Sequence, residues 1–236
     1  MIKVLIVDDS ALIRSLLGEI IRSEPEFLLV GAASDAYVAR DMVNQFRPDV
    51  ITLDVEMPKV DGLTFLEKLM KARPTAVIMI SSLTGQGADV TLRALELGAV
   101  DYLAKPKLDI ARGIEAYREE IISKIKVAAT AKIGKSVAST PKKLTPLRFK
   151  TTENVIAIGA STGGPPVIED IISKLGKDFP IPILIVQHMP AKFTATFSRR
   201  LNEACVIKVT EVSRVEQLLP GNVYLAAGGR DVVVRK

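Results

Sequence analysis

Short apolar segments alternate with amphipathic segments through the first half of this chain, and this alternation restricts the possible folds more than any other feature. The apolar segments have the composition of strands buried on both faces of a sheet, and they lie at 3–7, 27–32, 50–53, 76–80 and 100–104. Helical periodicity follows each of them: after Ser10, after Asp35, and at 62–71, 87–97 and 109–126. Strands that alternate with helices in this way are typical of a doubly wound parallel sheet. The sequence therefore predicts a flavodoxin-like α/β domain with five parallel strands over residues 1–126.

Residues whose side chains can bind a metal ion or take part in a reaction lie at the ends of four of these strands. They are Asp8 and Asp9, Asp54, Ser81, and Lys105. The carboxyl ends of parallel strands share one edge of the sheet, where ligands of such folds bind. Three carboxylates brought together repel one another unless a cation holds them, and hard oxygen ligands favour magnesium. Each of these residues alone is explained as well by a solvated loop. Their occurrence at four strand ends favours a functional site.

A carboxylate in this position can attack a phosphoryl group and form an aspartyl phosphate. Asp54 is the candidate, because it directly follows a buried strand and precedes a turn. The ammonium group of Lys105 and a metal ion would neutralise the charge on the phosphoryl group, and the Ser81 hydroxyl would donate a hydrogen bond to it. We therefore interpret Asp54 as a switch residue.

Residues 1–126 resemble the receiver domains of two-component response regulators in four motifs: Val-Asp-Asp-Ser, Leu-Asp-Val-Glu-Met-Pro, Ile-Ser-Ser and Lys-Pro. The resemblance implies that Asp54 is the phosphoacceptor and that a histidine kinase is the phosphodonor. It implies Mg²⁺ as the cofactor. It also implies that Asp9 and Asp54 are magnesium ligands, with Asp8 in support and the backbone carbonyl of Glu56 completing the set. Ser81 and Lys105 match the hydroxyl residue and the lysine of the family's phosphorylation site, and Tyr102 matches its rotating aromatic residue.

Residues 127–152 contain small residues, lysines and two prolines without sustained periodicity, which predicts a linker. Much of the excess positive charge of the chain (net +5, pI about 9.3) lies in this segment. A charged run of this kind favours a solvated tether over a nucleic-acid-binding patch. We therefore expect no nucleic-acid partner.

Two further features indicate the compartment. Cys205 is the only cysteine, so no disulfide framework is expected, and a reducing cytoplasm is the natural location. No apolar run reaches transmembrane length, and residues 2–7 lead into a strand rather than a signal peptide.

Residues 153–236 are predicted to form a second α/β domain. A strand at 155–158 is followed by Gly-Ala-Ser-Thr-Gly-Gly-Pro-Pro and then by helical periodicity. The glycine turn allows three interpretations: a purely structural turn, a phosphate-binding helix start, or a nucleophile turn of the G-x-S-x-G type that exposes Ser161. Neither G-x-G-x-x-G nor a G-K-[ST] ending is present, which weakens the second interpretation.

The next apolar segment, 183–186, ends in Gln-His-Met-Pro and favours the third interpretation. His188 is the only histidine of the chain. A lone histidine is more often packed or solvated than catalytic. Here it follows a strand beside the one that precedes Ser161, where a general base can reach the hydroxyl proton. The short spacing and the order differ from the Ser…Asp…His order of α/β-hydrolases, so that fold is not predicted.

The second half resembles the catalytic domain of the chemotaxis response regulator protein-glutamate methylesterases. The resemblance is carried by Ile-Gly-Ala-Ser-Thr-Gly-Gly-Pro, by Val-Gln-His-Met-Pro with the following Phe-Thr, and by Pro-Gly-Asn-Val-Tyr-Leu-Ala. It implies a carboxylic ester hydrolase with an incomplete Rossmann-like parallel sheet, Ser161 as nucleophile and His188 as general base. The implied substrates are glutamate methyl esters, and often glutamines, on chemoreceptors. The resemblance implies that the protein contacts the membrane only through these receptors. Phosphorylation of Asp54 would release the receiver from the active-site face.

Two departures from the family pattern bear on activity. The family's third catalytic residue is an aspartate in a later Gly-Met-Gly-x-Asp-Gly segment, and the chain ends at Lys236 before such a sequence. Loss of the orienting carboxylate of a triad lowers the rate by about 10⁴, so we expect reduced activity from the chain as given. The segment 226–231 also departs from the family. Asp231 lies there, and its spacing does not favour a role as substitute acid.

Two other functions are weighed against this one. A phosphorylation-responsive binding module with a truncated effector would share the first domain and lack esterase activity. A DNA-binding regulator is disfavoured, because the second domain begins with a strand and a glycine turn rather than the consecutive helices of a helix-turn-helix.

Overall fold

A computed structural model of the chain describes residues 1–81, 85–105, 111–133 and 154–235. The chain divides into two compact units, Met1–Gly134 and Lys135–Lys236, which are described separately. Residues 134–152 of the predicted linker and Pro106 of the Lys-Pro motif lie outside the described residues. The domain boundaries predicted from sequence, 1–126, 127–152 and 153–236, stay predictions.

The first unit contains a parallel five-stranded sheet with the order β2-β1-β3-β4-β5. Every neighbouring pair is parallel. The strands are β1 (Ile2–Val7), β2 (Phe27–Ala33), β3 (Val50–Asp54), β4 (Ala76–Ser81) and β5 (Asp101–Ala104). The doubly wound sheet predicted from the alternating pattern is therefore confirmed. Asp54 and Ser81 are the last residues of their strands rather than the first residues after them, which holds both at the carboxyl edge.

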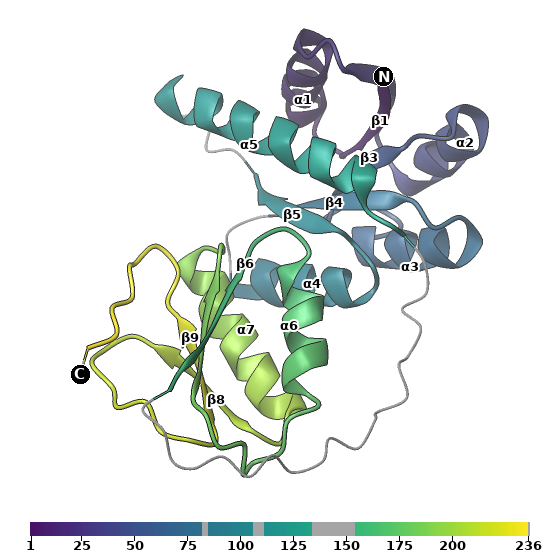
Figure 1. The fold of residues 1–236 in the computed structure, drawn as a ribbon. Helices are drawn as coiled ribbons and strands as arrows, with labels where there is room; N and C mark the ends of the chain where they lie inside the picture. Colours follow the sequence, from purple (N-terminus) through teal and green to yellow (C-terminus); the bar gives the residue numbers. More distant parts are fainter. Residues whose placement is uncertain (82–84, 106–110, 134–153, 236) are drawn as a thin grey trace. The chain divides into compact units, whose positions relative to one another are not determined.

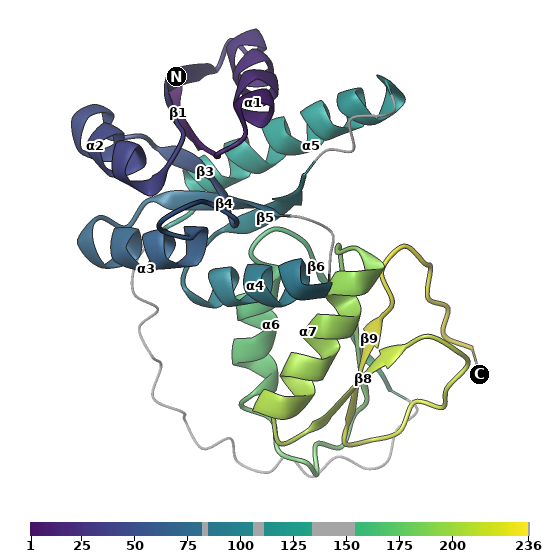
Figure 2. The ribbon, with the colours of Figure 1, turned by 180° about the vertical axis from the view of Figure 1, so that it is seen from behind.

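Five helices connect and cover these strands in the described part of the unit. They are α1 (Ala11–Ser23), α2 (Ala36–Phe46), α3 (Gly62–Ala72), α4 (Gly85–Glu96) and α5 (Ala111–Thr130). α1 and α5 lie on one face of the sheet, and α2, α3 and α4 lie on the other (Figures 1 and 2). Side chains at three helix starts accept backbone hydrogen bonds as N-caps: Ser10, Asp35 and Asp61. Ser10 and Asp35 were the helix starts predicted from sequence.

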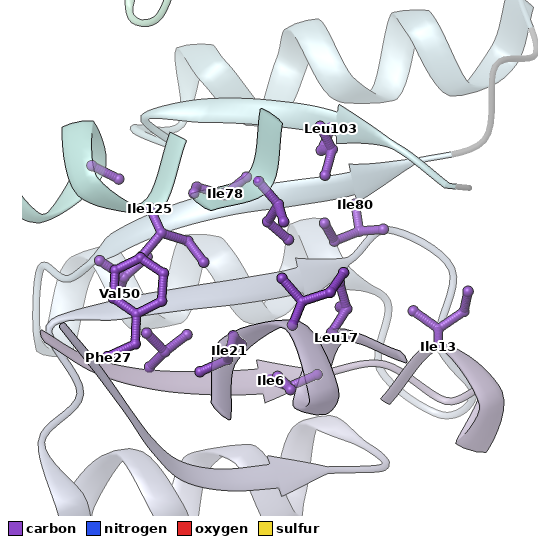
Figure 3. Close-up of a cluster of buried hydrophobic side chains, with 14 of the residues drawn as sticks. Ile6, Ile13, Leu17, Ile21, Phe27, Val50, Ile78, Ile80, Leu103 and Ile125 are labelled. Atoms are coloured by element: carbon purple, nitrogen blue, oxygen red, sulfur yellow. The ribbon is translucent and has the colours of Figure 1, made fainter. Parts of the chain in front are cut away.

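The hydrophobic core between the sheet and the α1–α5 layer is shown in Figure 3. Side chains from β1, β3 and β4 meet the apolar stripe of α1, represented by Leu17 and Ile21, both fully buried. Ile125 of α5 covers the same side, beside Val50 and Phe27. Burial of a large aliphatic side chain contributes about 1.5–3 kcal/mol, so this cluster fixes the sheet that presents the polar strand ends.

α5 is longer than the sequence indicates. The predicted helix ended at residue 126, whereas the observed helix continues to Thr130. Ala128 is fully buried and belongs to the core cluster, and the Thr130 hydroxyl donates to the carbonyl of Val127. The first residues of the segment predicted as linker are therefore helical, because a small side chain continues the buried stripe where the sequence pattern weakens.

The second unit contains a parallel sheet with the order β6-β7-β9-β8. Its strands are β6 (Ile156–Ala160), β7 (Ile183–Gln187), β8 (Lys208–Val212) and β9 (Asn222–Ala226). α6 (Gly164–Ile172) follows the glycine turn and packs beside α7 (Ala191–Ala204), which also contacts β8 and β9. Phe193 and Leu201 of α7 are buried. A second parallel α/β unit was predicted from sequence and is confirmed.

None of the helices in the described residues has the length and apolar character needed to span a membrane.

Candidate functional site

Three carboxylates come together at the carboxyl edge of the first sheet. β1 and β3 are neighbours with Val7 opposite Leu53, so the residues that follow these two positions, Asp8 and Asp54, are adjacent. Oxygen atoms of Asp8, Asp9 and Asp54 all lie within 4.8 Å of one another. Asp8 and Asp54 are fully buried and Asp9 is exposed. The parallel register thus assembles the acidic cluster that the strand-end pattern predicted.

Asp54 is held by one side chain and one backbone group. The ammonium of Lys105 lies 2.8 Å from its Oδ2, and the backbone N–H of Glu56 donates to its Oδ1 at 3.2 Å. Lys105 reaches this position from the end of β5, past β4. Ser81, at the end of β4 between them, is buried, and its hydroxyl donates to the carbonyl of Gly87 at 3.4 Å. Ser81 therefore lies on the strand next to the one that carries Asp54, and Lys105 follows the strand beyond it.

The charges in the cluster are not balanced. Burial, followed by the negative charge of Asp54, raises the pKa of Asp8 to about 6. Burial also raises the pKa of Asp54, although the hydrogen bond from Lys105 lowers it in part. Burial lowers the pKa of Lys105, but the hydrogen bond and charge of Asp54 outweigh this effect and raise it. One ammonium therefore faces three carboxylates.

The donor set fits a magnesium ion. Hard carboxylate oxygens with one exposed side are the ligands that this ion takes while it keeps several waters. Oδ1 of Asp8 accepts a hydrogen bond from the backbone N–H of Ser10, whereas its buried Oδ2 has no hydrogen-bond partner among the described residues. An ionised, buried oxygen without a donor is costly, and a divalent cation would remove this cost. Glu56 is exposed beside the cluster, and the position of its backbone carbonyl as a further ligand stays a prediction.

Replacing Asp8 by asparagine is expected to stabilise the metal-free protein above pH 6. Since the pKa of Asp8 is raised from 3.8 to about 6, its ionised form opposes folding, and this penalty disappears as the pH falls through 6 towards 3.8. The full shift corresponds to at most about 3 kcal/mol. Thermal unfolding of the receiver unit in EDTA should therefore give a higher Tm for Asp8→Asn than for wild type at pH 8, and a clearly smaller difference at pH 4.5, where about a third of the penalty remains.

Magnesium provides the control for this prediction. Millimolar Mg²⁺ at pH 8 should raise the Tm of the wild-type protein, because the ion binds the folded state, and should raise that of Asp8→Asn much less. Asp41→Asn, a change at an exposed aspartate of α2, should leave both responses intact. An equal Mg²⁺ response in Asp8→Asn would contradict the role assigned to this carboxylate.

Tyr102 is buried in β5, three residues before Lys105. The ammonium of Lys124 lies 5.3 Å from the centre of its ring and donates to its backbone carbonyl at 2.9 Å. The same ammonium also pairs with Asp101 at 2.9 Å. Lys124 comes from α5, and no motif in the sequence indicated that it would contact Tyr102.

A cavity of about 630 Å³ opens beside the acidic cluster, between the β3–α3 loop and α4. Asp9, Glu56 and Pro58 line it on one side and Arg93 on the other. The exposed carboxylate of the cluster is therefore accessible from a space large enough for a small phosphorylated molecule.

The second unit brings Ser161 and His188 to one edge. Ala160 and Gln187 are register partners at the ends of the parallel strands β6 and β7, and the next residues along the two strands are Ser161 and His188. The backbone N–H of His188 donates to the carbonyl of Ala160 at 2.9 Å. Neighbouring strands lie about 4.8 Å apart, and both side chains are exposed. The candidate nucleophile and base thus each follow the last residue of adjacent strands, at equivalent positions in the register.

Gln187 directly precedes His188, and the sequence analysis assigned no role to it. Its side chain is 6% exposed, and its Nε2 donates to the backbone carbonyl of Ser161 at 2.9 Å and to that of His188 at 3.4 Å. The apolar residue before it, Val186, is 46% exposed. A polar residue therefore faces inward while its apolar neighbour faces outward.

The segment after β9 packs against the segment after His188. A side chain at Gly228 would overlap the backbone carbonyl of Met189. The N–H of Gly228 donates to the hydroxyl of Thr194 at 3.0 Å, and this hydroxyl donates to Glu211 at 2.6 Å. Thr194 is fully buried. Asp231 lies three residues beyond Gly228 and is exposed, which gives no support to a role as substitute acid.

Comparison with known proteins identifies the family. The family "Response regulator receiver domain" matches residues 4–118, and the family "CheB methylesterase" matches residues 156–236. A protein-glutamate methylesterase/protein-glutamine glutaminase of Shewanella oneidensis is 56% identical over 241 aligned residues, which cover 100% of this chain and 68% of the relative. The chain belongs to the CheB family of protein-glutamate methylesterases.

Other members of the CheB family agree with this assignment. The corresponding protein of Pseudomonas aeruginosa is 52% identical over 100% of this chain and 67% of its own length. The chain therefore spans about two thirds of the length of these relatives. Among solved structures, the response regulator domain of CheB from Thermotoga maritima is 43% identical, covers 56% of this chain and 98% of its own, and has a TM-score of 0.51.

Within each unit of this CheB family member, the structure brings the candidate residues of that half of the chain together. The first contains the residues predicted at the four strand ends of the receiver unit: Asp8, Asp9, Asp54, Ser81 and Lys105. The second contains Ser161 and His188. Sequence analysis assigned no role to Gln187 or Thr194, although both lie in the motif around His188 that carries the family resemblance.

Proposed function

We propose that this chain is a protein-glutamate methylesterase of bacterial chemotaxis whose activity is controlled by phosphorylation of Asp54. The observation that carries the proposal is the register of β6 and β7, which places Ser161 and His188 after paired strand ends. The family membership established above supplies the reaction class, and the acidic cluster of the receiver unit supplies the control site.

In the receiver unit, a carboxylate oxygen of Asp54 attacks the phosphorus atom, and the bond from phosphorus to the leaving group of the donor breaks. The donor is a phosphohistidine of the chemotaxis kinase or a small acyl phosphate that enters by the cavity beside Asp9. Lys105, already hydrogen-bonded to Asp54, neutralises charge on the transferred group, and Ser81 donates a hydrogen bond to it. A magnesium ion held by Asp8, Asp9 and Asp54 supplies further charge neutralisation when bound. Tyr102 would report the phosphorylated state by a change of its ring position.

In the second unit, the Oγ of Ser161 attacks the ester carbonyl of a methylated glutamate while His188 takes the hydroxyl proton. His188 then returns this proton to the methoxy oxygen, and methanol leaves. Water activated by His188 hydrolyses the acyl-serine, which regenerates Ser161 and releases the glutamate carboxylate. Attack on a glutamine side chain by the same route would release ammonia.

The partners that follow are a chemotaxis histidine kinase and methylated chemoreceptors. Both meet the protein in the cytoplasm, and contact with the membrane is only through the receptors. We expect no nucleic-acid partner.

The test is methanol release from methylated receptor by this chain, with and without a small phosphodonor and Mg²⁺. We expect phosphorylation to raise the rate at least several-fold, and the increase to disappear in Asp54→Asn. A wild-type rate that does not exceed the receptor-only background under either condition would contradict the proposed activity. A rate that is the same with and without phosphodonor would contradict only the proposed control.

A further inference from the structure

We infer that Gln187 is a positioning residue that fixes the main chains bearing Ser161 and His188 relative to each other. The inference rests on the proposed function, since it concerns how that nucleophile and base are aligned. The amide of Gln187 contacts the backbone carbonyls of these two residues and not their reacting side-chain atoms. It therefore acts through their backbone.

The hydrogen bonds of its amide carry the argument. The last backbone hydrogen bond between β6 and β7 joins the N–H of His188 to the carbonyl of Ala160. Beyond it the strands end, and the backbone on both sides would be free to separate. The Nε2 of Gln187 provides the next cross-link, by donating to the carbonyl of Ser161 at 2.9 Å and to that of His188 at 3.4 Å. One amide thus contacts the backbone of both candidate residues.

The orientation of this amide follows from its neighbours. Both groups near Nε2 are carbonyl oxygens, which only accept hydrogen bonds. Exchange of the amide nitrogen and oxygen would place an oxygen against two acceptors, so the NH₂ group must face them. Only an uncharged amide, or another group with two donors at this distance, can make both contacts.

The other side of the amide is fixed by a close approach of the backbone. A β-carbon at Gly164, the first residue of α6, would overlap Oε1 of Gln187. This oxygen is buried and has no hydrogen-bond partner among the described residues. Leaving a buried acceptor unsatisfied is unfavourable. The fold therefore retains a polar side chain where an apolar one of equal length would avoid this cost, which indicates that the two donated hydrogen bonds matter for the site.

Alignment of a nucleophile and its base is sensitive to small displacements, and a shift of about 1 Å can lower a rate about 100-fold. Gln187→Met keeps the length of the side chain and removes both donors. We expect it to lower the maximal rate of Ser161 modification by a fluorophosphonate, a covalent probe of serine nucleophiles, by about 10- to 100-fold. The probe concentration at half-maximal rate should change little. Gln187→Glu, which places a carboxylate against the two carbonyls, should lower the rate at least as much.

Two controls separate this inference from the proposed function. Ser161→Ala must abolish labelling, and equal labelling in that variant would mean that Ser161 is not the nucleophile. Gln217→Met makes the same chemical change at an exposed glutamine of the same unit, and its labelling rate should stay within about twofold of wild type, well below the effect of misalignment. If labelling depends on Ser161 but Gln187→Met reacts at the wild-type rate, the positioning role is wrong.

A spectroscopic measurement distinguishes positioning from simple loss of stability. His188 is the only histidine, so its imidazole gives a single set of NMR signals. In the wild-type background, Ser161→Ala should shift these signals, because the two residues follow paired strand ends. In the Gln187→Met background, at a temperature where the protein is folded, the same substitution should cause a clearly smaller shift. Equal shifts in the two backgrounds would overturn the inference.

Discussion

Replacing Ser161 by alanine is expected to reduce methanol release from methylated receptor by at least about 100-fold, to the background rate, because the acyl-serine cannot form. His188→Gln should cause a loss of similar size, since the hydroxyl of Ser161 would lack a base. The double variant should be no less active than either single variant, because the two residues act as one unit. The measurement is the rate of methanol release at saturating receptor, with binding to the receptor followed separately.

The control for this experiment is Ser213→Ala, a change at an exposed serine in the same unit. It should leave the rate unchanged. Receptor binding should persist in Ser161→Ala, because this substitution removes a single exposed hydroxyl. Residual activity in Ser161→Ala above the receptor-only background would show that another group attacks the ester, and the assignment of the nucleophile would be wrong.

Replacing Asp54 by asparagine is expected to abolish phosphorylation of the chain. Asp54 is fully buried, and Lys105 and the N–H of Glu56 fix the orientation of its carboxylate. An amide at this position is a far weaker nucleophile and also removes one of the three carboxylates that fit magnesium. Incubation with a small phosphodonor and Mg²⁺ should add one phosphate to wild type and none to Asp54→Asn, as measured by intact-protein mass spectrometry.

The exposed Asp41 provides the matched control, since Asp41→Asn should be phosphorylated at the wild-type rate. Lys105→Met should keep the nucleophile but remove the charge that Asp54 contacts at 2.8 Å, so phosphorylation should be slower rather than absent. Omission of Mg²⁺ should slow it as well. A phosphate found on any residue other than Asp54 would contradict the assignment of the switch.

Much of the receiver unit was predictable from the order of residue types. Short apolar segments that alternate with amphipathic ones specify a parallel sheet with helices on both faces, and the sheet then gathers its strand ends at one edge. Asp8, Asp54 and Ser81 are therefore predictable as neighbours even though they are far apart in the chain. The residue types alone favour magnesium at this edge, because three neighbouring carboxylates repel one another unless a cation neutralises them.

Local patterns were less informative where a residue's environment depends on distant segments. α5 continues to Thr130 because Ala128 enters a core formed by other elements, which the composition of its own segment does not reveal. β9 lies between β7 and β8, although β8 precedes it in the chain. The packing of Gly228 against the residues after His188 results from this strand order.

The sequence by itself determined the two α/β units, the family and the chemical identity of the candidate residues, because periodicity and motifs are properties of each segment. Only the tertiary structure decided how these residues are supported. Gln187 illustrates the difference, since its polarity predicts exposure and yet it is buried while Val186 is exposed. Its hydrogen-bond partner Ser161 is 26 residues away, and a contact of this kind exists only after the parallel register of β6 and β7 has formed.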